Sequence, residues 1–113
     1  MTTIGQPVPE LPVGDLERAR NYYCDSLGFE KRWAFPEIAA VSRGGVTIFF
    51  RLSSVSITPQ NHWIYAENVD ATFEEMRAAG AMIVDPISEK PWGMRQFTVR
   101  DPDGHQFYVH RDI

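Results

Sequence analysis

The chain repeats one order of structural elements twice, and this repetition limits its fold more than any other feature. The stretch 13–17 (VGDLE) returns in altered form at 68–74 (NVDATFE), so that Asp15 and Asp70 stand 55 positions apart. Both stretches lie where an extended run gives way to a helical pattern. Self-similarity of this kind indicates a duplicated structural unit. We therefore expect one domain, 1–113, made of two modules at about 6–53 and 60–113.

The pattern of the first module predicts a strand, a helix and three more strands. Residues 8–13 fit a short strand, and Asp15 is a natural N-cap for an amphipathic helix that runs to about Ser26. Gly28 is a natural helix stop. Three extended runs follow at 29–35, 38–43 and 46–52, separated by Pro36 and by the Gly44-Gly45 turn.

The second module repeats this order. A strand at 62–66 precedes a helix from about Asp70 to Ala79, which Gly80 closes. Strands are expected at 81–84, 94–99 and 106–110, with a loop at 85–93 and a tight turn at 101–104. The predicted fold class is α+β, with two β-α-β-β-β modules that form a curved mixed sheet, helices on its outer face and a concave ligand cleft.

Side-chain alternation divides the strands into two faces. Asn61, Trp63 and Tyr65 share one face, as do Thr47, Phe49 and Arg51 on another strand and Gln106, Tyr108 and His110 on the last. Large apolar residues are usually buried. We assign to the core the residues Phe29, Phe50, Phe73, Phe107 and Val109.

Composition and charge exclude several classes of protein. Hydrophobic residues make up 43% of the chain and charged residues 23%, without a twenty-residue apolar span or a basic, apolar leader, so we expect a soluble cytoplasmic protein. The net charge of −4 disfavours binding to nucleic acid or to anionic membranes. Cys24 has no partner for an internal disulfide and is expected to be a small residue on a helix.

Four segments together resemble a bleomycin resistance protein of the glyoxalase/bleomycin resistance/dioxygenase (vicinal oxygen chelate) superfamily. They are 8–15 (VPELPVGD), 22–29 with Tyr22-Tyr23 and Leu27-Gly28-Phe29, 91–97 (PWGMRQF) and 100–105 (RDPDGH). The strand-to-helix junction and the 101–104 turn are shared with glyoxalases and extradiol dioxygenases. The segment 91–97 is more particular to the bleomycin resistance branch, and the resemblance covers almost the whole chain.

The resemblance implies a homodimer that exchanges N-terminal strands near Pro9 and binds drug in two crevices at the subunit interface. It implies stoichiometric sequestration of a bleomycin-type antibiotic, with no catalytic residue and no cofactor. In the family a Trp at the position of Trp92 stacks on the flat tail of the drug. The family's second stacking ring falls at Ile38, where this chain departs from the pattern, so that Trp33 or Phe35 would have to replace it.

Matching to the metal enzymes of the superfamily places Val8, Phe49, Asn61 and Tyr108 at the four metal-ligand positions. This match also implies that the face with Asn61 is the concave one. A divalent metal needs several imidazole or carboxylate donors, and this set lacks them, so no metal is expected. Among the three histidines, His62 should face the helices, His105 lies in the turn, and His110 ends the last strand.

Aromatic rings with polar tips on one concave face suit a planar ligand. The predicted ligand-binding residues are Trp33, Phe35, Ile38, Phe49, Arg51, Asn61, Trp63, Tyr65, Trp92, Met94 and Tyr108. Two alternatives remain open. One is an enzyme of the glyoxalase, isomerase or dioxygenase sort, with either an unforeseen metal site or a ligand set from Glu10, His62 and His110. The other is a binder of a different planar metabolite.

Overall fold

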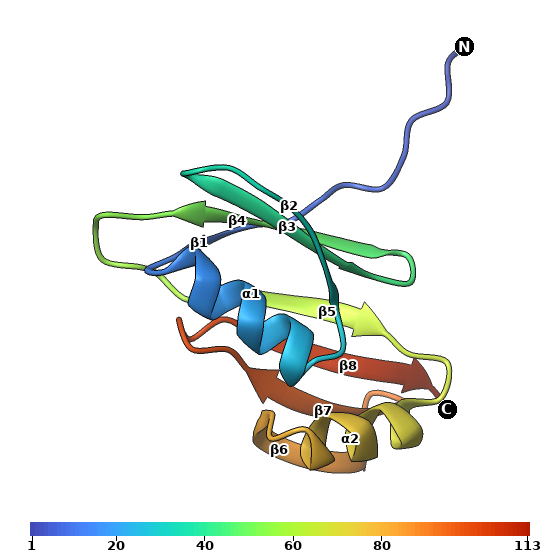
Figure 1. The fold of residues 1–113 in the computed structure, drawn as a ribbon. Coiled ribbons are helices and arrows are strands. Elements are labelled where there is room, and N and C mark those ends of the chain that lie inside the picture. The colour runs from blue at the N-terminus through green and yellow to red at the C-terminus, as the bar shows by residue number, and fades with distance from the viewer.

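The structure is a computed structural model that describes residues 1–113, and it contains the predicted order of elements twice (Figure 1). The first half comprises β1 (Glu10–Val13), α1 (Leu16–Asp25), β2 (Glu30–Ala34), β3 (Ile38–Arg43) and β4 (Val46–Leu52). The second half comprises β5 (Asn61–Tyr65), α2 (Val69–Ala78), β6 (Met82–Lys90), β7 (Met94–Arg100) and β8 (Gln106–Asp112). Neither helix is long and apolar enough to cross a lipid bilayer.

The eight strands form two four-stranded mixed sheets, in the orders β1-β4-β3-β2 and β5-β8-β7-β6. The pairs β1–β4 and β5–β8 are parallel, and the remaining pairs are antiparallel. Each helix connects the first strand of its half to the following antiparallel strands. The α+β class and the repeated β-α-β-β-β order are therefore confirmed.

Both helices begin at the predicted junction. The Asp15 carboxylate accepts a hydrogen bond from the backbone N–H of Arg18, and the Asn68 side chain does the same for Ala71. These bonds satisfy N–H groups that have no partner inside the helix. The second cap is Asn68, so α2 begins one residue before the predicted Asp70.

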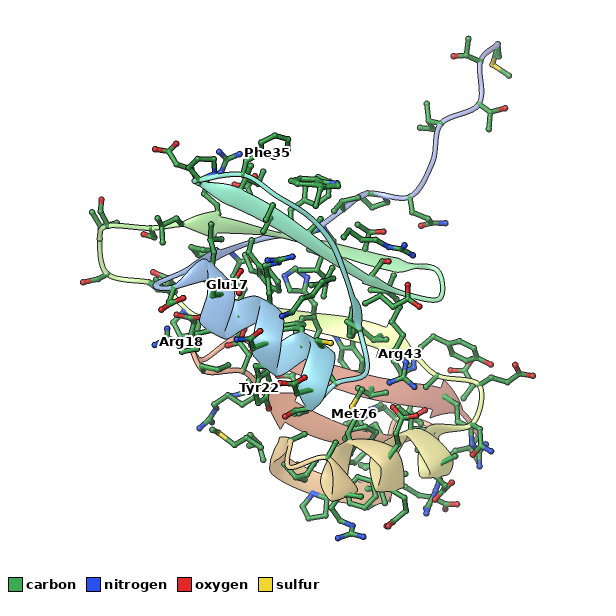
Figure 2. The ribbon with its side chains drawn as sticks, viewed as in Figure 1. Glu17, Arg18, Tyr22, Phe35, Arg43 and Met76 are labelled. Atoms are coloured by element: carbon green, nitrogen blue, oxygen red, sulfur yellow. The ribbon has the colours of Figure 1, made fainter.

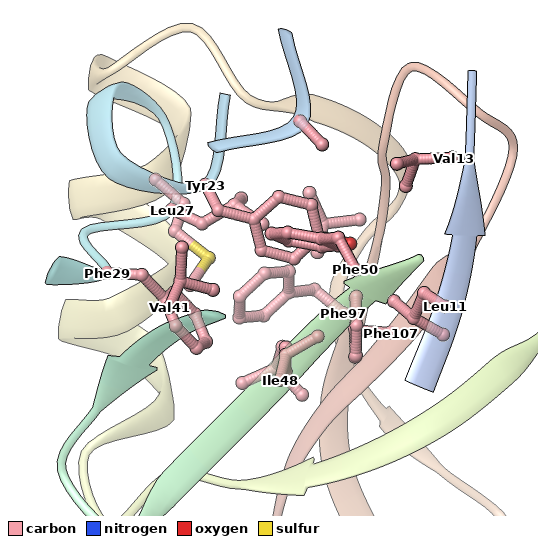
Figure 3. Close-up of a cluster of buried hydrophobic side chains, with 14 of the residues drawn as sticks. Leu11, Val13, Tyr23, Leu27, Phe29, Val41, Ile48, Phe50, Phe97 and Phe107 are labelled. Carbon is pink, nitrogen blue, oxygen red and sulfur yellow. The ribbon is translucent and has the colours of Figure 1, made fainter. Parts of the chain in front are cut away.

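Residues from both halves form a single hydrophobic core (Figure 3). At its centre the Tyr23 ring of α1 lies 4.8 Å from the Phe50 ring of β4 and 6.0 Å from the Phe107 ring of β8, measured between centroids. The predicted core residues Phe29, Phe50, Phe107 and Val109 are buried, whereas Phe73 is only partly buried and packs against the core. Because side chains alternate along each strand and both sheets turn one face to this core, the other face of each sheet points away from the core.

The turn between β7 and β8 ties the second half to the first. The Asp103 carboxylate accepts hydrogen bonds from the Gly14 backbone N–H and from the Arg18 guanidinium, each at 2.9 Å. The His105 ring is fully buried, with Nε2 2.7 Å from the Pro12 carbonyl oxygen and Nδ1 3.0 Å from the Gln60 backbone nitrogen. Since the Gln60 N–H donates to Nδ1, the hydrogen of this ring is on Nε2.

The prediction of a loop at 85–93 was wrong for most of its length, because β6 runs from Met82 to Lys90. Pro86 interrupts the sequence pattern of a strand. Proline is tolerated there because β6 is the outer strand of its sheet and has a free edge. Two register shifts on either side of Asp85 further break the alternation that would have revealed a strand.

Candidate functional site

Two exposed sheet faces carry the residues that the sequence singled out. The first-sheet face is the side of β1 to β4 that points away from the core, and it holds Arg51, Phe49 and Trp33. Phe35 follows β2 and lies at the end of the molecule remote from Met76 of α2 (Figure 2). The second-sheet face is the corresponding side of β5 to β8.

A β-bulge builds the aromatic cluster of the first-sheet face. Two residues of β2, Arg32 and Trp33, stand opposite the single residue Ala40 of β3. Such an extra residue bends the strand and re-aims a side chain. The Trp33 ring consequently lies 5.1 Å from that of Phe49 and 5.7 Å from that of Phe35. This face therefore has an aromatic surface although Ile38 supplies no ring.

Ile38 and Arg51 are paired neighbours on β3 and β4. Ile38 is half-buried, whereas Arg51 is exposed and binds both carboxylate oxygens of Glu10, with the Nη2–Oε2 distance at 3.0 Å. The hydrogen bond from Arg51 lowers the pKa of Glu10. The positive charge of Arg51, which was predicted to point into the cleft, is thus balanced by Glu10 on the same face.

Three rings and a histidine line the second-sheet face. Trp63 of β5 lies 4.7 Å from the Tyr108 ring and 5.4 Å from the His110 ring of β8, and Tyr65 lies 6.0 Å from His110. Trp63 is 53% exposed and Tyr65 is 63% exposed, and Asn61 begins the same strand. Exposed apolar surface of this extent is typical of a binding face.

Trp92 lies in the turn between β6 and β7, and its ring is 58% exposed. Its Nε1–H donates a 2.8 Å hydrogen bond to Oε1 of Gln96 on β7. Met94, the first residue of β7, is half-buried and pairs with Lys90. The Lys90 ammonium is 2.7 Å from the Asp85 carboxylate, so the charges of this edge also compensate each other.

The structure does not bring the aromatic clusters of the two faces into contact within one chain. No ring contact joins Trp33 or Phe49 to Trp63 or Tyr108, because the shared core separates the two faces. The predicted residues therefore form two groups, one for each sheet, and each group is open to solvent.

The four residues that the resemblance matched to metal-ligand positions are also divided between the faces. Phe49 lies on the first-sheet face, Asn61 and Tyr108 lie on the second, and Val8 is in the exposed N-terminal segment. A valine and a phenylalanine supply no donor atom, so these residues do not fit a divalent cation.

The residues of the enzyme alternative are likewise apart. Glu10 binds Arg51, whereas the His62 ring is 3.1 Å from Oε1 of Gln60 and 6.1 Å from the core residue Phe107. Burial lowers the pKa of His62. His110 belongs to the second-sheet face, and its Nδ1 has no hydrogen-bond partner in the chain.

A groove of about 740 Å³ opens between the two halves. It is lined by three segments, Gln6–Pro9, Gly45–Ile48 and His62–Tyr65, together with Phe107. Its volume lies within the range of small-molecule sites. Residues 1–8 are exposed and extend away from the body of the protein (Figure 1).

Sequence reasoning missed Gln96 and Thr98, two polar residues of β7 that are almost fully buried on the second-sheet face. Their positions alternate with the core residues Phe97 and Val99, so their direction could have been inferred from the strand pattern. Their burial could not, because it depends on the side chains that cover them.

Comparisons with known proteins agree on one family. The family model described as "Glyoxalase/Bleomycin resistance protein/Dioxygenase superfamily" matches residues 3–109. TioX from Micromonospora sp. ML1 is 30% identical, with a TM-score of 0.85 over 94% of this chain and 97% of that one. No curated protein matches.

Two further solved structures are similar. The bleomycin-binding protein from bleomycin-producing Streptomyces verticillus, complexed with copper(II)-bleomycin, is 28% identical, with a TM-score of 0.80 over 96% of this chain and 97% of that one. A glyoxalase-related enzyme from Fulvimarina pelagi is 26% identical, with a TM-score of 0.68 over 97% of this chain and 88% of that one.

Proposed function

This chain belongs to the glyoxalase/bleomycin resistance protein/dioxygenase superfamily, and from that premise we propose that it sequesters a flat antibiotic of the bleomycin type by stoichiometric binding. In this proposal it has no catalytic residue, and neither a metal nor another cofactor takes part. The drug is kept from its target by being held in an aromatic site, and no turnover is required.

The observation that carries the proposal is the kind of residue on the two exposed faces. By the resemblance, Phe49 and Tyr108 take the places of metal ligands in the enzymes of the superfamily, and more rings surround both residues. A ring contact contributes about 0.5–1.5 kcal/mol beyond the area that it buries. The similarity to a bleomycin-binding protein over nearly the full chain supports the same function.

We further propose that the site is completed by a homodimer. In one chain the shared core separates the two aromatic clusters, so neither cluster encloses a ligand by itself. If the first-sheet face of one subunit meets the second-sheet face of its partner, Trp33 and Phe49 would face the partner's Trp63 and the partner's Trp92. Two such sites would form in each dimer, as two-fold symmetry requires.

The N-terminal segment suits an exchanged arm. Pro9 already pairs with β4 of its own chain, since its carbonyl accepts a 3.0 Å hydrogen bond from the Phe49 N–H. Residues 1–8 therefore remain for exchange. Their exposed apolar side chains, Ile4 and Val8, are available for contact with a partner subunit. We propose that this arm reaches across the dimer interface, while residues 1–113 act as one domain with repeated halves at about 6–53 and 60–113.

The deciding experiment is calorimetric titration of the metal-free protein with bleomycin, combined with sedimentation to measure the mass. We expect saturable heat with one drug per subunit and the mass of a dimer. The matched variant is Trp63→Ala, which removes an exposed ring of the proposed site without opening the core, so it should fold normally and bind bleomycin more weakly. Absence of heat with the wild type would overturn the choice of bleomycin.

The second candidate is an enzyme of the glyoxalase or dioxygenase kind, favoured by the similarity to a glyoxalase-related enzyme and by the unpartnered Nδ1 of His110. Elemental analysis of the purified protein separates the two functions. A stoichiometric metal that is lost in His110→Ala would favour the enzyme. If the protein neither binds bleomycin nor contains a metal, we propose that the aromatic faces bind another planar metabolite.

A further inference from the structure

Trp92 is strongly exposed, yet a hydrogen bond defines the orientation of its ring. It lies in a turn of three residues beside Gly93, whose backbone has φ of +84°. A tryptophan in such a place has few neighbours to hold it, since 58% of its surface is exposed. The one polar interaction of its ring is the 2.8 Å hydrogen bond from Nε1 to Oε1 of Gln96.

Gln96, the acceptor of this bond, is itself held in a fixed position. It lies in the middle of β7, paired with Ser88 on one side and His110 on the other, and only 3% of it is exposed. An indole N–H can only donate, so the amide oxygen must face Trp92 and the orientation of the amide is fixed. Burial of a glutamine on a sheet face is unfavourable unless it has a partner, and Trp92 is the partner.

We propose that Gln96 is a positioning residue that holds the Trp92 ring in place before any ligand arrives. This inference rests on the proposed function, because it concerns the ring expected to stack on the drug. The bond holds the indole by its nitrogen edge and does not use the flat sides of the ring, which are the sides that stack on a planar ligand. A ring that is fixed in the free protein loses less conformational freedom on binding, so the ligand is bound more tightly.

The first test uses the wild-type protein without ligand. Neither Trp33 nor Trp63 donates a hydrogen bond from its indole nitrogen within the chain, and both are less exposed than Trp92. Exposure alone therefore predicts that the Trp92 N–H exchanges fastest with solvent. We expect NMR to show the opposite, with Trp92 the slowest of the three. Exchange at Trp92 as fast as at the other two would overturn the proposal.

The second test follows the motion of the ring. In a Trp33→Phe, Trp63→Phe background, fluorescence anisotropy decay reports on Trp92 alone. Gln96→Met keeps the length of the side chain and removes the acceptor, so we expect faster ring motion and stronger quenching by acrylamide. Thr98→Val is the control, since Thr98 is equally buried on the same face and makes no bond to Trp92. Equal anisotropy in both variants would contradict the proposal.

The third test links the position of the ring to binding of bleomycin. We expect Gln96→Met to weaken binding about 3- to 10-fold and to have no further effect in a Trp92→Phe background, because phenylalanine cannot donate the bond. An equal loss in both backgrounds would mean that Gln96 acts independently of Trp92. If the wild type does not bind bleomycin, the proposed function fails while the exchange and anisotropy results still decide the role of Gln96.

Discussion

The Tyr23 hydroxyl donates a 2.7 Å hydrogen bond to Oδ2 of Asp101, which joins the first helix to the turn between the last two strands. Both residues are almost completely buried. Burial raises the pKa of the Asp101 carboxyl, while the bond from Tyr23 opposes that effect. This contact therefore couples the two halves of the chain through one buried polar pair.

Removing this bond should destabilise the protein. In Tyr23→Phe, Oδ1 of Asp101 still accepts hydrogen bonds from the backbone N–H groups of Asp103 and His105. Oδ2 loses the hydrogen bond from the tyrosine hydroxyl. Loss of a partner by a buried charged group costs about 1–3 kcal/mol. Denaturant unfolding should show this decrease, and Tyr65→Phe, which alters an exposed ring, should leave the midpoint unchanged.

Alkaline pH should destabilise the fold through the same tyrosine. Burial, reinforced by the Asp101 charge, raises the pKa of Tyr23 well above its ordinary value. The stabilising contribution is complete below about pH 10, the pKa of tyrosine in an unfolded chain, and is lost as pH rises toward the folded-state value. Unfolding free energies measured from pH 8 upward should therefore fall above pH 10, and the fall should be smaller in Tyr23→Phe.

Substitution of two adjacent residues of β8 should have different effects on stability and on bleomycin binding. Phe107 packs in the core against Tyr23, and Phe107→Ala should lower the free energy of unfolding by roughly 3–5 kcal/mol. Tyr108 belongs to the exposed face, so Tyr108→Ala should destabilise the fold less and weaken bleomycin binding more. Thermal unfolding and calorimetric titration of both variants would check this, and equal destabilisation would contradict the assignment of faces.

Truncation of Trp92 should affect binding more than folding. Its ring is largely exposed, and its removal lets water reach the Gln96 amide, so Trp92→Ala should leave the unfolding midpoint nearly unchanged while binding of a planar drug weakens by more than about 1 kcal/mol. Unaltered affinity, measured by calorimetry, would remove Trp92 from the site.

Deletion of residues 1–8 tests the exchanged arm. These residues lie outside the core and β1 begins only at Glu10, so the shortened chain should fold. We expect sedimentation to show a weaker dimer and calorimetry to show a parallel loss of bleomycin binding. A control in which Thr2 and Thr3 are replaced by Ser should behave as the wild type. If the shortened chain dimerises as strongly as the wild type, residues 1–8 do not form an exchanged arm.

Several features were determined by the sequence alone. The N-caps, the glycine helix stops and the strict alternation of strands such as β5 and β8 are local signals, because each depends on neighbours a few residues away. They were sufficient to predict the repeated order of elements and the burial of Phe50 and Phe107, whereas the direction of Trp63 and Tyr65 also required the resemblance to the superfamily.

Other features were decided only by the tertiary structure. The strand at Asp85–Lys90 forms because β7 is available to pair with it, although Pro86 argues against a strand locally. The bulge that turns Trp33 onto Phe49, and the burial of Gln96 beneath its neighbours, depend on strand register and on packing. The separation of the two aromatic clusters follows from the shared core around Tyr23. Alternation tells which side chains share a face, but only the packing of one sheet against another decides where that face points.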